Sequence, residues 1–289
     1  MKLSIFSHCA LDTISIEGNS YEQIGGAASY CGLMAREFKF NVNLFTKFGP
    51  DFPKQYLTKH KINLINSESK KYTTKFSISI SGSDRTLKLE NECDPIEYSN
   101  LDADGHIVSP IFHEILDDVF KKIKSDSNFL FVDPQGFLRQ KDSNNNIILK
   151  KTDLDLSNVN AIKINPEEGQ NIVSGSHDEM MLALQKKGIE YVLLTNKTDV
   201  SLLVKNRVYS LKLPNKNIHD TTGIGDIFCS AFTCTMLKEK DFLWALCFAA
   251  GSAQAALEYN AVGLQKIPKK GMVENNASYF YNLVDFRDL

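Results

Sequence analysis

The sequence predicts an α/β protein with a mostly parallel central sheet, helices on both faces of that sheet, and a small second sheet. From about residue 105 onward, short apolar runs of strand length alternate with helical patterns, which is typical of a parallel sheet covered on both faces. Residues 72–90 instead alternate apolar and polar side chains around a turn, which indicates a two-stranded ribbon. The 289 residues, 43% of them hydrophobic, suffice for a single large α/β domain spanning residues 1–289.

The bulk composition argues against several classes of protein. A net charge of −2 does not suit a general nucleic-acid binder, which carries a basic excess. The uncharged stretch 242–257 is shorter than the roughly 20 residues that span a bilayer, so we expect a buried helix and no membrane contact. The N-terminus lacks the long apolar core of a secretory signal, and the six cysteines show no zinc-ligand or C-x-x-C spacing. We therefore expect a cytoplasmic protein with reduced thiols.

The first half of the chain predicts the start of the main sheet and all of the small one. In order, we expect a strand over 2–6, a hairpin over 13–24 with its turn at 17–20, a helix over 27–38, a strand over 42–45 and a helix over 54–60. In the ribbon, Phe76 and Ile78 lie on its apolar face, and the turn falls at 81–84. An isolated ribbon is barely stable in water. Residues 13–24 and 72–90 are therefore expected to form a small sheet that rests on the main body.

The second half predicts the alternating part of the main sheet. Strands are expected over 106–109, 128–132, 161–164 and 191–195, and helices over about 111–124, 168–187, 224–238 and 241–258. Residues 200–204 and 207–211 predict a hairpin beyond the last of these strands. The polar run 141–151 predicts a surface loop.

A glycine-containing turn at 220–226 is the segment richest in chemistry. Gly223 and Gly225 permit backbone angles that other residues resist, and an apolar helix follows at once. Free N–H groups at such a helix start form an anion site, for which phosphate is the usual ligand. Asp226 lies inside this site. It is either an ordinary acidic residue of the first helical turn or a base that takes the proton of an attacking hydroxyl.

The segment from Asp220 to Asp226 resembles the C-terminal motif of the ribokinase-like (PfkB) family of sugar and nucleoside kinases. The sequence Asp-Thr-Thr-Gly-Ile-Gly-Asp departs from the common motif only at Ile224, where alanine is usual. The P-loop motif and the dinucleotide-binding G-x-G-x-x-G motif are both absent. The resemblance implies that Asp226 is the catalytic base, with Gly223, Ile224 and Gly225 forming the anion hole.

Three further segments occur in the order that this family requires, so the resemblance spans nearly the whole chain. Gly25-Gly26 resembles the substrate-contacting turn of the N-terminal motif, although Ser29 and Tyr30 stand where many members have an asparagine nearby. Asp12 occupies the place where relatives bind substrate hydroxyls; without the family it reads equally as a turn cap. The implied fold is a three-layer α/β/α sandwich with a lid formed by about 13–24 and 72–90.

The resemblance also implies a set of ligand-binding residues. Asn165 and Glu168 match the N-x-x-E element that organises Mg²⁺, largely through water, although Asn-Pro followed by glutamates is also an ordinary helix start. Gln135 and Arg139 follow a strand end and are either substrate ligands or part of a solvent-facing turn. The residues expected at ATP are Thr195, Thr222, Gly223, Gly225 and Val262. Asp220 and Thr222 resemble the monovalent-cation loop of some relatives, which makes K⁺ a candidate cofactor.

The expected function is transfer of the γ-phosphate of ATP to a hydroxyl of a nucleoside, an inositol or other polyol, or a sugar. A catalytically silent ligand sensor with the same fold is the alternative, disfavoured because Asp226, Asn165 and Glu168 are all present. A nucleotide-dependent oxidoreductase is disfavoured by the missing glycine motif. The apolar ribbon face suits either a homodimer formed through the lid or a lid that covers its own active site.

Overall fold

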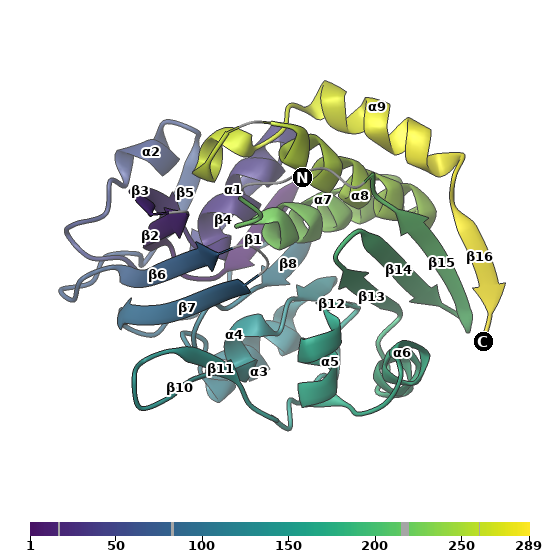
Figure 1. Ribbon diagram of the computed structural model, residues 1–289, viewed down its shortest axis with the longest axis horizontal. Helices are drawn as coiled ribbons and strands as arrows, with labels where there is room; N and C mark the ends of the chain where they lie inside the picture. Colours follow the sequence, from purple (N-terminus) through teal and green to yellow (C-terminus); the bar gives the residue numbers. More distant parts are fainter. Residues whose placement is uncertain (17, 82–83, 215–219, 260) are drawn as a thin grey trace.

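Ten strands form the central sheet among the residues that the structure describes (Figure 1). The computed structural model describes residues 1–16, 18–81, 84–214, 220–259 and 261–289. The parallel strands, in spatial order, are β5 (Ile62–Ile65), β4 (Asn41–Phe45), β1 (Lys2–Phe6), β8 (Gly105–Val108), β9 (Leu130–Val132), β12 (Ala161–Ile164) and β13 (Tyr191–Asn196). The antiparallel strands β14 (Asp199–Val204), β15 (Arg207–Lys212) and β16 (Asp285–Asp288) continue the sheet beyond β13. The predicted mostly parallel architecture and the hairpin beyond its last strand are confirmed.

Helices cover both faces of this sheet and bury two separate apolar clusters against it (Figure 1). One face carries α1 (Ala27–Glu37), α7 (Ile224–Glu239), α8 (Phe242–Glu258) and α9 (Lys270–Tyr281). The other carries α3 (Asp117–Asp126), α5 (Pro166–Ile172) and α6 (His177–Lys186). The short elements are α2 (Gln55–Thr58), α4 (Gln135–Leu138) and the 3₁₀ helix η1 (Gly263–Lys266). Within the described residues, no helix is long and apolar enough to cross a membrane, and α8, which contains the uncharged stretch 242–257, packs between α7 and α9.

The small sheet lies beside the carboxyl ends of the central strands and is built from both predicted segments (Figure 1). Its order is β3 (Asn19–Gly25), β2 (Ala10–Ile16), β6 (Thr74–Ser81) and β7 (Asp84–Asn91). The sheet is therefore slightly larger than expected, and Asp12 lies inside β2 instead of in a turn after the first strand, which corrects that expectation. Parts of the two predicted turns, Glu17 and residues 82–83, lie outside the described residues.

The apolar face of the small sheet is buried within the chain. Phe76 and Ile78 pack with Ile14 and with Ile111 from the main body. This arrangement corresponds to the expectation that the ribbon covers its own active site. The homodimer stays a prediction.

Two predicted helices have different boundaries for identifiable reasons. The helix expected from residue 111 begins at Asp117, because the buried Glu114 carboxylate accepts the N–H groups of His8, Ile111 and Phe112 at 2.7–2.9 Å and fixes a turn there. The helix expected over 168–187 is two helices, because Gly175 has φ +133° and Ser176 starts α6 with a capping box.

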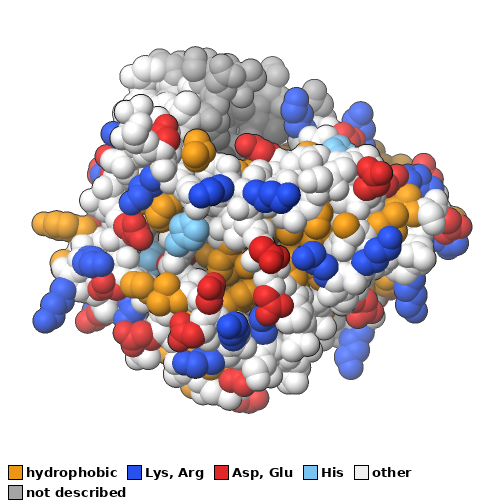
Figure 2. Space-filling model, turned by 90° about the horizontal axis from the view of Figure 1, so that it is seen from below, with side chains coloured by type: hydrophobic (Ala, Val, Ile, Leu, Met, Phe, Trp, Pro, Cys, Tyr) orange, Lys and Arg blue, Asp and Glu red, His pale blue; other side chains and the backbone are white. Residues whose placement is uncertain are grey.

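The predicted loop 141–151 contains part of a hairpin. The short strands β10 (Arg139–Lys141) and β11 (Ile147–Leu149) pair across a turn in which Asp142 accepts hydrogen bonds from the N–H groups of Asn144 and Asn146. On the face of the molecule seen in Figure 2, basic and acidic side chains are interspersed, with hydrophobic side chains between them. That mixture agrees with the small net charge.

Candidate active site

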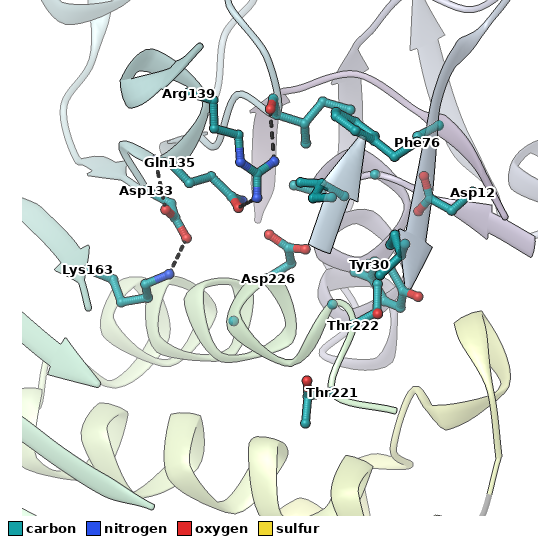
Figure 3. Close-up of a pocket in the computed structure, with 18 residues that line it drawn as sticks. Asp12, Tyr30, Phe76, Asp133, Gln135, Arg139, Lys163, Thr221, Thr222 and Asp226 are labelled. Carbon is teal, nitrogen blue, oxygen red and sulfur yellow. Dashed lines mark hydrogen bonds and ion pairs between the residues drawn. The ribbon is translucent and has the colours of Figure 1, made fainter. Parts of the chain in front are cut away.

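A cavity of about 150 Å³ lies between the carboxyl ends of the central strands, the start of α7 and the small sheet. The side chains that line it come from segments far apart in the sequence and converge on one space (Figure 3). The charged and amide side chains are Asp12, Asp133, Gln135, Arg139, Lys163 and Asp226. The small sheet contributes the apolar side chains of Phe76, Ile78 and Leu87. The small sheet therefore forms one wall of the cavity.

The turn before α7 has the backbone conformation that its glycines suggested. Gly223 is the N-cap of the helix with φ +79°, in the left-handed region, and the Ile227 N–H donates to its carbonyl at 3.0 Å. A Cβ on Gly223 would lie 2.5 Å from the ring of Tyr30, so the aromatic ring packs directly on this turn. Gly223 and Gly225 border the cavity, whereas Ile224 packs against the hydrophobic core. The larger residue at position 224 therefore does not narrow the cavity.

Asp226 is buried in the first turn of α7, with 9% of its surface exposed. Its Oδ1 accepts a hydrogen bond from Ser109 Oγ at 3.4 Å. Burial and the negative charge of Asp133 raise the pKa of Asp226 to about 7, against the opposing charges of Lys163 and Arg139. A carboxyl group with that pKa exchanges a proton near neutral pH, which is the range a general base needs.

A buried ion pair lies beside Asp226. Lys163 Nζ donates to Asp133 Oδ2 at 2.6 Å, and both side chains are at most 8% exposed. Burial alone would lower the pKa of Lys163, but the charges of Asp133 and Glu168 raise it well above its usual value. A Cβ on Gly225 would lie 3.4 Å from Lys163 Nζ. The cavity therefore holds a permanently charged ammonium group against the glycine turn.

Arg139 and Gln135 hold each other at the cavity wall. The guanidinium donates to Gln135 Oε1 at 2.8 Å and to the carbonyl of Ile111 at 2.9 Å, and lies 5.9 Å from the centre of the Phe76 ring. The guanidinium group itself lines the cavity. Both side chains therefore line the cavity, and that they bind a substrate stays a prediction.

Asp12 lines the opposite side of the cavity, and Gly25 makes room for it. A Cβ on Gly25 would lie 1.9 Å from Asp12 Oδ2, so only glycine lets this carboxylate lie across the neighbouring strand. Gly26 begins α1 with φ +80° and itself borders the cavity. Asp226 lies between Asp12 on one side and the Lys163–Asp133 pair on the other (Figure 3).

Asn165 and Glu168 form a capping box at the start of α5. The Asn165 side chain accepts the Glu168 N–H at 2.8 Å, and Glu168 Oε2 accepts the Asn165 N–H at 2.9 Å. The ordinary helix-start interpretation is therefore present in the structure, and neither side chain borders the cavity. Burial raises the pKa of Glu168, while the charge of Lys163 opposes that shift.

That Asn165 and Glu168 hold Mg²⁺ through water stays a prediction. No three His, Cys, Asp or Glu side chains lie together as a direct metal site among the described residues. Mg²⁺ keeps several waters and takes few protein ligands when it accompanies phosphates. Both side chains carry hard oxygen atoms of that kind, and the charge of Glu168 acts on Lys163, but Asn165 Oδ1 and Glu168 Oε2 already accept backbone N–H groups.

The residues expected around ATP do not all lie at the cavity. Thr222 borders the cavity, and its N–H donates to Asp220 Oδ1 at 2.8 Å. Thr195 pairs with Val200 in the β13–β14 hairpin, and Val262 is 44% exposed; neither borders the cavity. In the segment that resembles a monovalent-cation loop, the carbonyl groups of Asp220 and Thr222 accept hydrogen bonds from Lys266 Nζ.

Three side chains of the site were not predicted as functional. Lys163 is the charged residue in the otherwise apolar strand β12, which was an available signal. Asp133 directly follows β9, the position where ligands gather in open α/β sheets. Tyr30 was noticed only as a departure from a family motif, yet its ring covers Gly223.

Comparisons with known proteins show the family and the fold of this chain. Residues 23–270 match the family described as pfkB family carbohydrate kinase. A pyrophosphate-dependent kinase in the ribokinase family, determined with sulfate, is 17% identical, with a TM-score of 0.82 over 95% of this chain and 99% of its own. The ribokinase of Arabidopsis thaliana, complexed with ribose and ATP, is 14% identical, with a TM-score of 0.74 over 96% and 98%. The nucleoside kinase of Methanocaldococcus jannaschii is 17% identical, with a TM-score of 0.74 over 96% and 99%. A comparison with curated protein sequences finds no match.

Proposed function

We propose that this chain, which belongs to the pfkB family of carbohydrate kinases, transfers the γ-phosphate of ATP to a hydroxyl of a single-ring polyol or sugar. The match over 23–270 and the structural similarities confirm the predicted family and its ribokinase-like fold. The observation that carries the proposal is the position of Asp226. It is a buried carboxyl group with a pKa of about 7, on a helix-start glycine turn and in a cavity of polar side chains.

In the proposed reaction, the acceptor hydroxyl lies between Asp12 and Asp226. Asp226 takes the hydroxyl proton while the hydroxyl oxygen forms its bond to the γ-phosphorus, and the bond from that phosphorus to the β,γ-bridging oxygen breaks to release ADP. The N–H groups of Gly223 and Gly225 and the ammonium group of Lys163 stabilise charge on the transferred phosphoryl group, whereas the Ile224 N–H donates to the Thr221 carbonyl at 3.3 Å. Mg²⁺, when bound near Asn165 and Glu168, would neutralise phosphate charge.

The cavity supports a small acceptor. Its volume of about 150 Å³ is below the ~300–1,000 Å³ of pockets that take drug-sized ligands. Asp12, Gln135 and Arg139 provide both acceptors and donors for several hydroxyl groups. We therefore rank a single-ring polyol or sugar before a nucleoside.

The small sheet completes the proposed site by excluding water. Phe76 and Ile78 place apolar surface over the cavity, which limits hydrolysis of the donor. We further propose that residues 1–289 act as one domain in the cytoplasm, in keeping with six buried free thiols.

Pyrophosphate is a second candidate donor. Thr195, which was expected at ATP, continues into a tight hairpin with β14 and takes no part in the cavity. Three structurally similar proteins, with TM-scores of 0.80–0.82, are described as pyrophosphate-dependent kinases or as converted from one. Pyrophosphate contains no adenine, so a protein that uses it as the phosphoryl donor would need no adenine pocket.

The experiment is a matrix of donors and acceptors. The purified protein is incubated with ATP or pyrophosphate and with inositols, hexoses, pentoses, aldonates and nucleosides, and phosphorylated product is measured directly. We expect turnover of a polyol or sugar, and a loss of ~10²–10⁴ in kcat for Asp226→Asn. Turnover of this variant within about tenfold of wild type would exclude Asp226 as the general base. If no combination of donor and acceptor gives phosphorylated product, the result would favour the ligand sensor.

A further inference from the structure

We propose that the ammonium group of Lys266 is a built-in cation that holds the turn 220–223 in the place of a monovalent metal ion. The active site would then be shaped without K⁺. Where it concerns catalysis, this inference rests on the proposed function. Its structural part concerns only how the turn is held together.

The contacts of Lys266 match the hydrogen-bonding capacity of an ammonium group. Its Nζ lies 2.7 Å from Asp220 Oδ2, 3.1 Å from the Asp220 carbonyl oxygen and 2.8 Å from the Thr222 carbonyl oxygen. An ammonium group has three N–H donors, and among the described residues one carboxylate and two carbonyl oxygens lie within hydrogen-bond distance of it. Carbonyl and carboxylate oxygens are also the ligands that a K⁺ ion would use. The donor set expected for K⁺ is therefore engaged by the side chain of Lys266.

The pair is buried, so the ammonium group is a fixed part of the fold. The side chains of Lys266 and Asp220 are 1% and 2% exposed. Burial pushes the pKa of Asp220 upward, but the charge and hydrogen bonds of Lys266 outweigh it and keep that pKa below its usual value. Asp220 Oδ1 also accepts the Thr222 N–H, so one carboxylate joins Lys266 to the turn by two routes.

These contacts bear directly on the phosphate-binding groups. In a planar trans peptide, the C=O of one residue and the N–H of the next point in opposite directions. Fixing the Thr222 carbonyl on Lys266 therefore directs the Gly223 N–H away from Lys266. Gly223 borders the cavity, three residues before Asp226. Lys266 is thus a positioning residue that acts through the turn.

The place of Lys266 in the chain agrees with such a role. It ends η1, more than 40 residues after the turn it binds. The Gly263 N–H at the other end of η1 lies 3.4 Å from Asp220 Oδ2. The short helix therefore fastens the turn at two points.

The test compares cations in wild type, Lys266→Ala and Lys266→Gln. A matched control is Lys269→Ala, which removes a lysine that is 70% exposed and pairs with Glu37 on the surface. Tm and the phosphoryl-transfer rate are measured with potassium, sodium or tetramethylammonium chloride at an ionic strength of about 0.1 M. The measurement of Tm needs no substrate. It therefore tests the structural inference even if no acceptor is phosphorylated and the proposed function is wrong.

We expect wild type and Lys269→Ala to show the same Tm and rate in all three salts. Lys266→Ala should lose roughly 5–15 °C in Tm, because a buried carboxylate is left without its partner, and K⁺ should restore more of that loss than tetramethylammonium. In the rate arm, kcat should fall about tenfold or more and recover in part with K⁺. Lys266→Gln, which fills the space where K⁺ would bind, should show the loss without the recovery.

Two outcomes would overturn the inference. One is wild-type activation or stabilisation by K⁺ over tetramethylammonium, which would place a working cation site in the intact protein. The other is a Lys266→Ala protein with wild-type Tm in tetramethylammonium. If Lys266→Ala does not fold in any salt, the comparison of wild-type Tm and rate between potassium and tetramethylammonium chloride still tests the inference.

Discussion

Lys163 Nζ lies 2.6 Å from Asp133 Oδ2, and this buried ion pair shares a cavity with Asp226. The arrangement puts two carboxyl groups and one ammonium group, all largely buried, within one small space. Asp133 raises the pKa of Asp226 and Lys163 lowers it, so the ion pair adjusts the proton affinity of the proposed base from both directions. Replacing either partner should therefore change chemistry as well as stability.

Lys163→Met should lower kcat and move the pH dependence upward. The variant removes a positive charge at the glycine turn, which we expect to cost ~10²-fold in kcat. It also leaves Asp133 without its partner, so Asp226 should ionise at a higher pH than in wild type. The measurement is kcat/KM as a function of pH. The control is Lys124→Met, which removes a similarly buried lysine paired with Asp155 at 2.5 Å outside the cavity. An unchanged midpoint in Lys163→Met would contradict the electrostatic role.

The wild-type enzyme should lose activity as the pH falls through about 7. A general base works only in its ionised form, and burial holds the Asp226 carboxyl protonated below that pH. We expect log kcat/KM to rise with unit slope at low pH and to level off above the midpoint. The profile is measured from about pH 5 to about pH 9 with a saturating donor. A midpoint near 4, the value of an ordinary carboxyl group, would show that burial does not control this residue.

The sequence predicted the site best where its parts are contiguous. The turn 220–226 carries its own geometry, because two glycines and a helix start determine where the N–H groups point. Asp12, Gln135 and Arg139 were found from their places along the predicted strands and a family motif. The fold class followed from alternation alone, since a parallel sheet needs a crossover after each strand.

What the sequence did not predict depends on distant contacts. Whether Lys163 faces solvent or a cavity depends on which face of β12 it occupies, and strand alternation does not give that face. The helix expected from residue 111 is shortened because Glu114 reaches the N–H of His8, more than 100 residues away. Lys266 likewise meets Asp220 across 46 residues. Such long-range pairing leaves no local pattern.

Asp226→Asn should stabilise the protein, and more so at high pH. The folded-state pKa of Asp226, about 7, is above its unfolded value near 3.9, so the folded wild type holds the proton more tightly. The stability of wild type therefore falls as the pH rises from about 4 to about 7, whereas asparagine does not ionise. We expect a gain of roughly 1–3 kcal/mol at about pH 8 and little at about pH 4, from urea unfolding at both values. A gain equal at both values would contradict the burial of an ionising carboxyl group.

Gly223→Ala should impair the site beyond the strain of its backbone, and Gly188→Ala is the control that separates the two effects. Both glycines have positive φ, +79° and +98°, so alanine costs about 1–2 kcal/mol at either. A Cβ on Gly188 meets nothing within 4 Å, whereas one on Gly223 would lie 2.5 Å from the ring of Tyr30.

Gly188→Ala should therefore lower the free energy of unfolding by about 1–2 kcal/mol and leave kcat unchanged. Gly223→Ala should lose more stability and ~10²-fold or more in kcat, because the ring and the turn must move apart and displace the N–H groups that face the phosphate. The double variant with Tyr30→Ala and Gly223→Ala should lose less stability than the sum of the losses of the two single variants, since the clash is absent once the buried ring is removed. Equal losses of stability and of kcat in the two single variants would mean that Tyr30 does not constrain the turn.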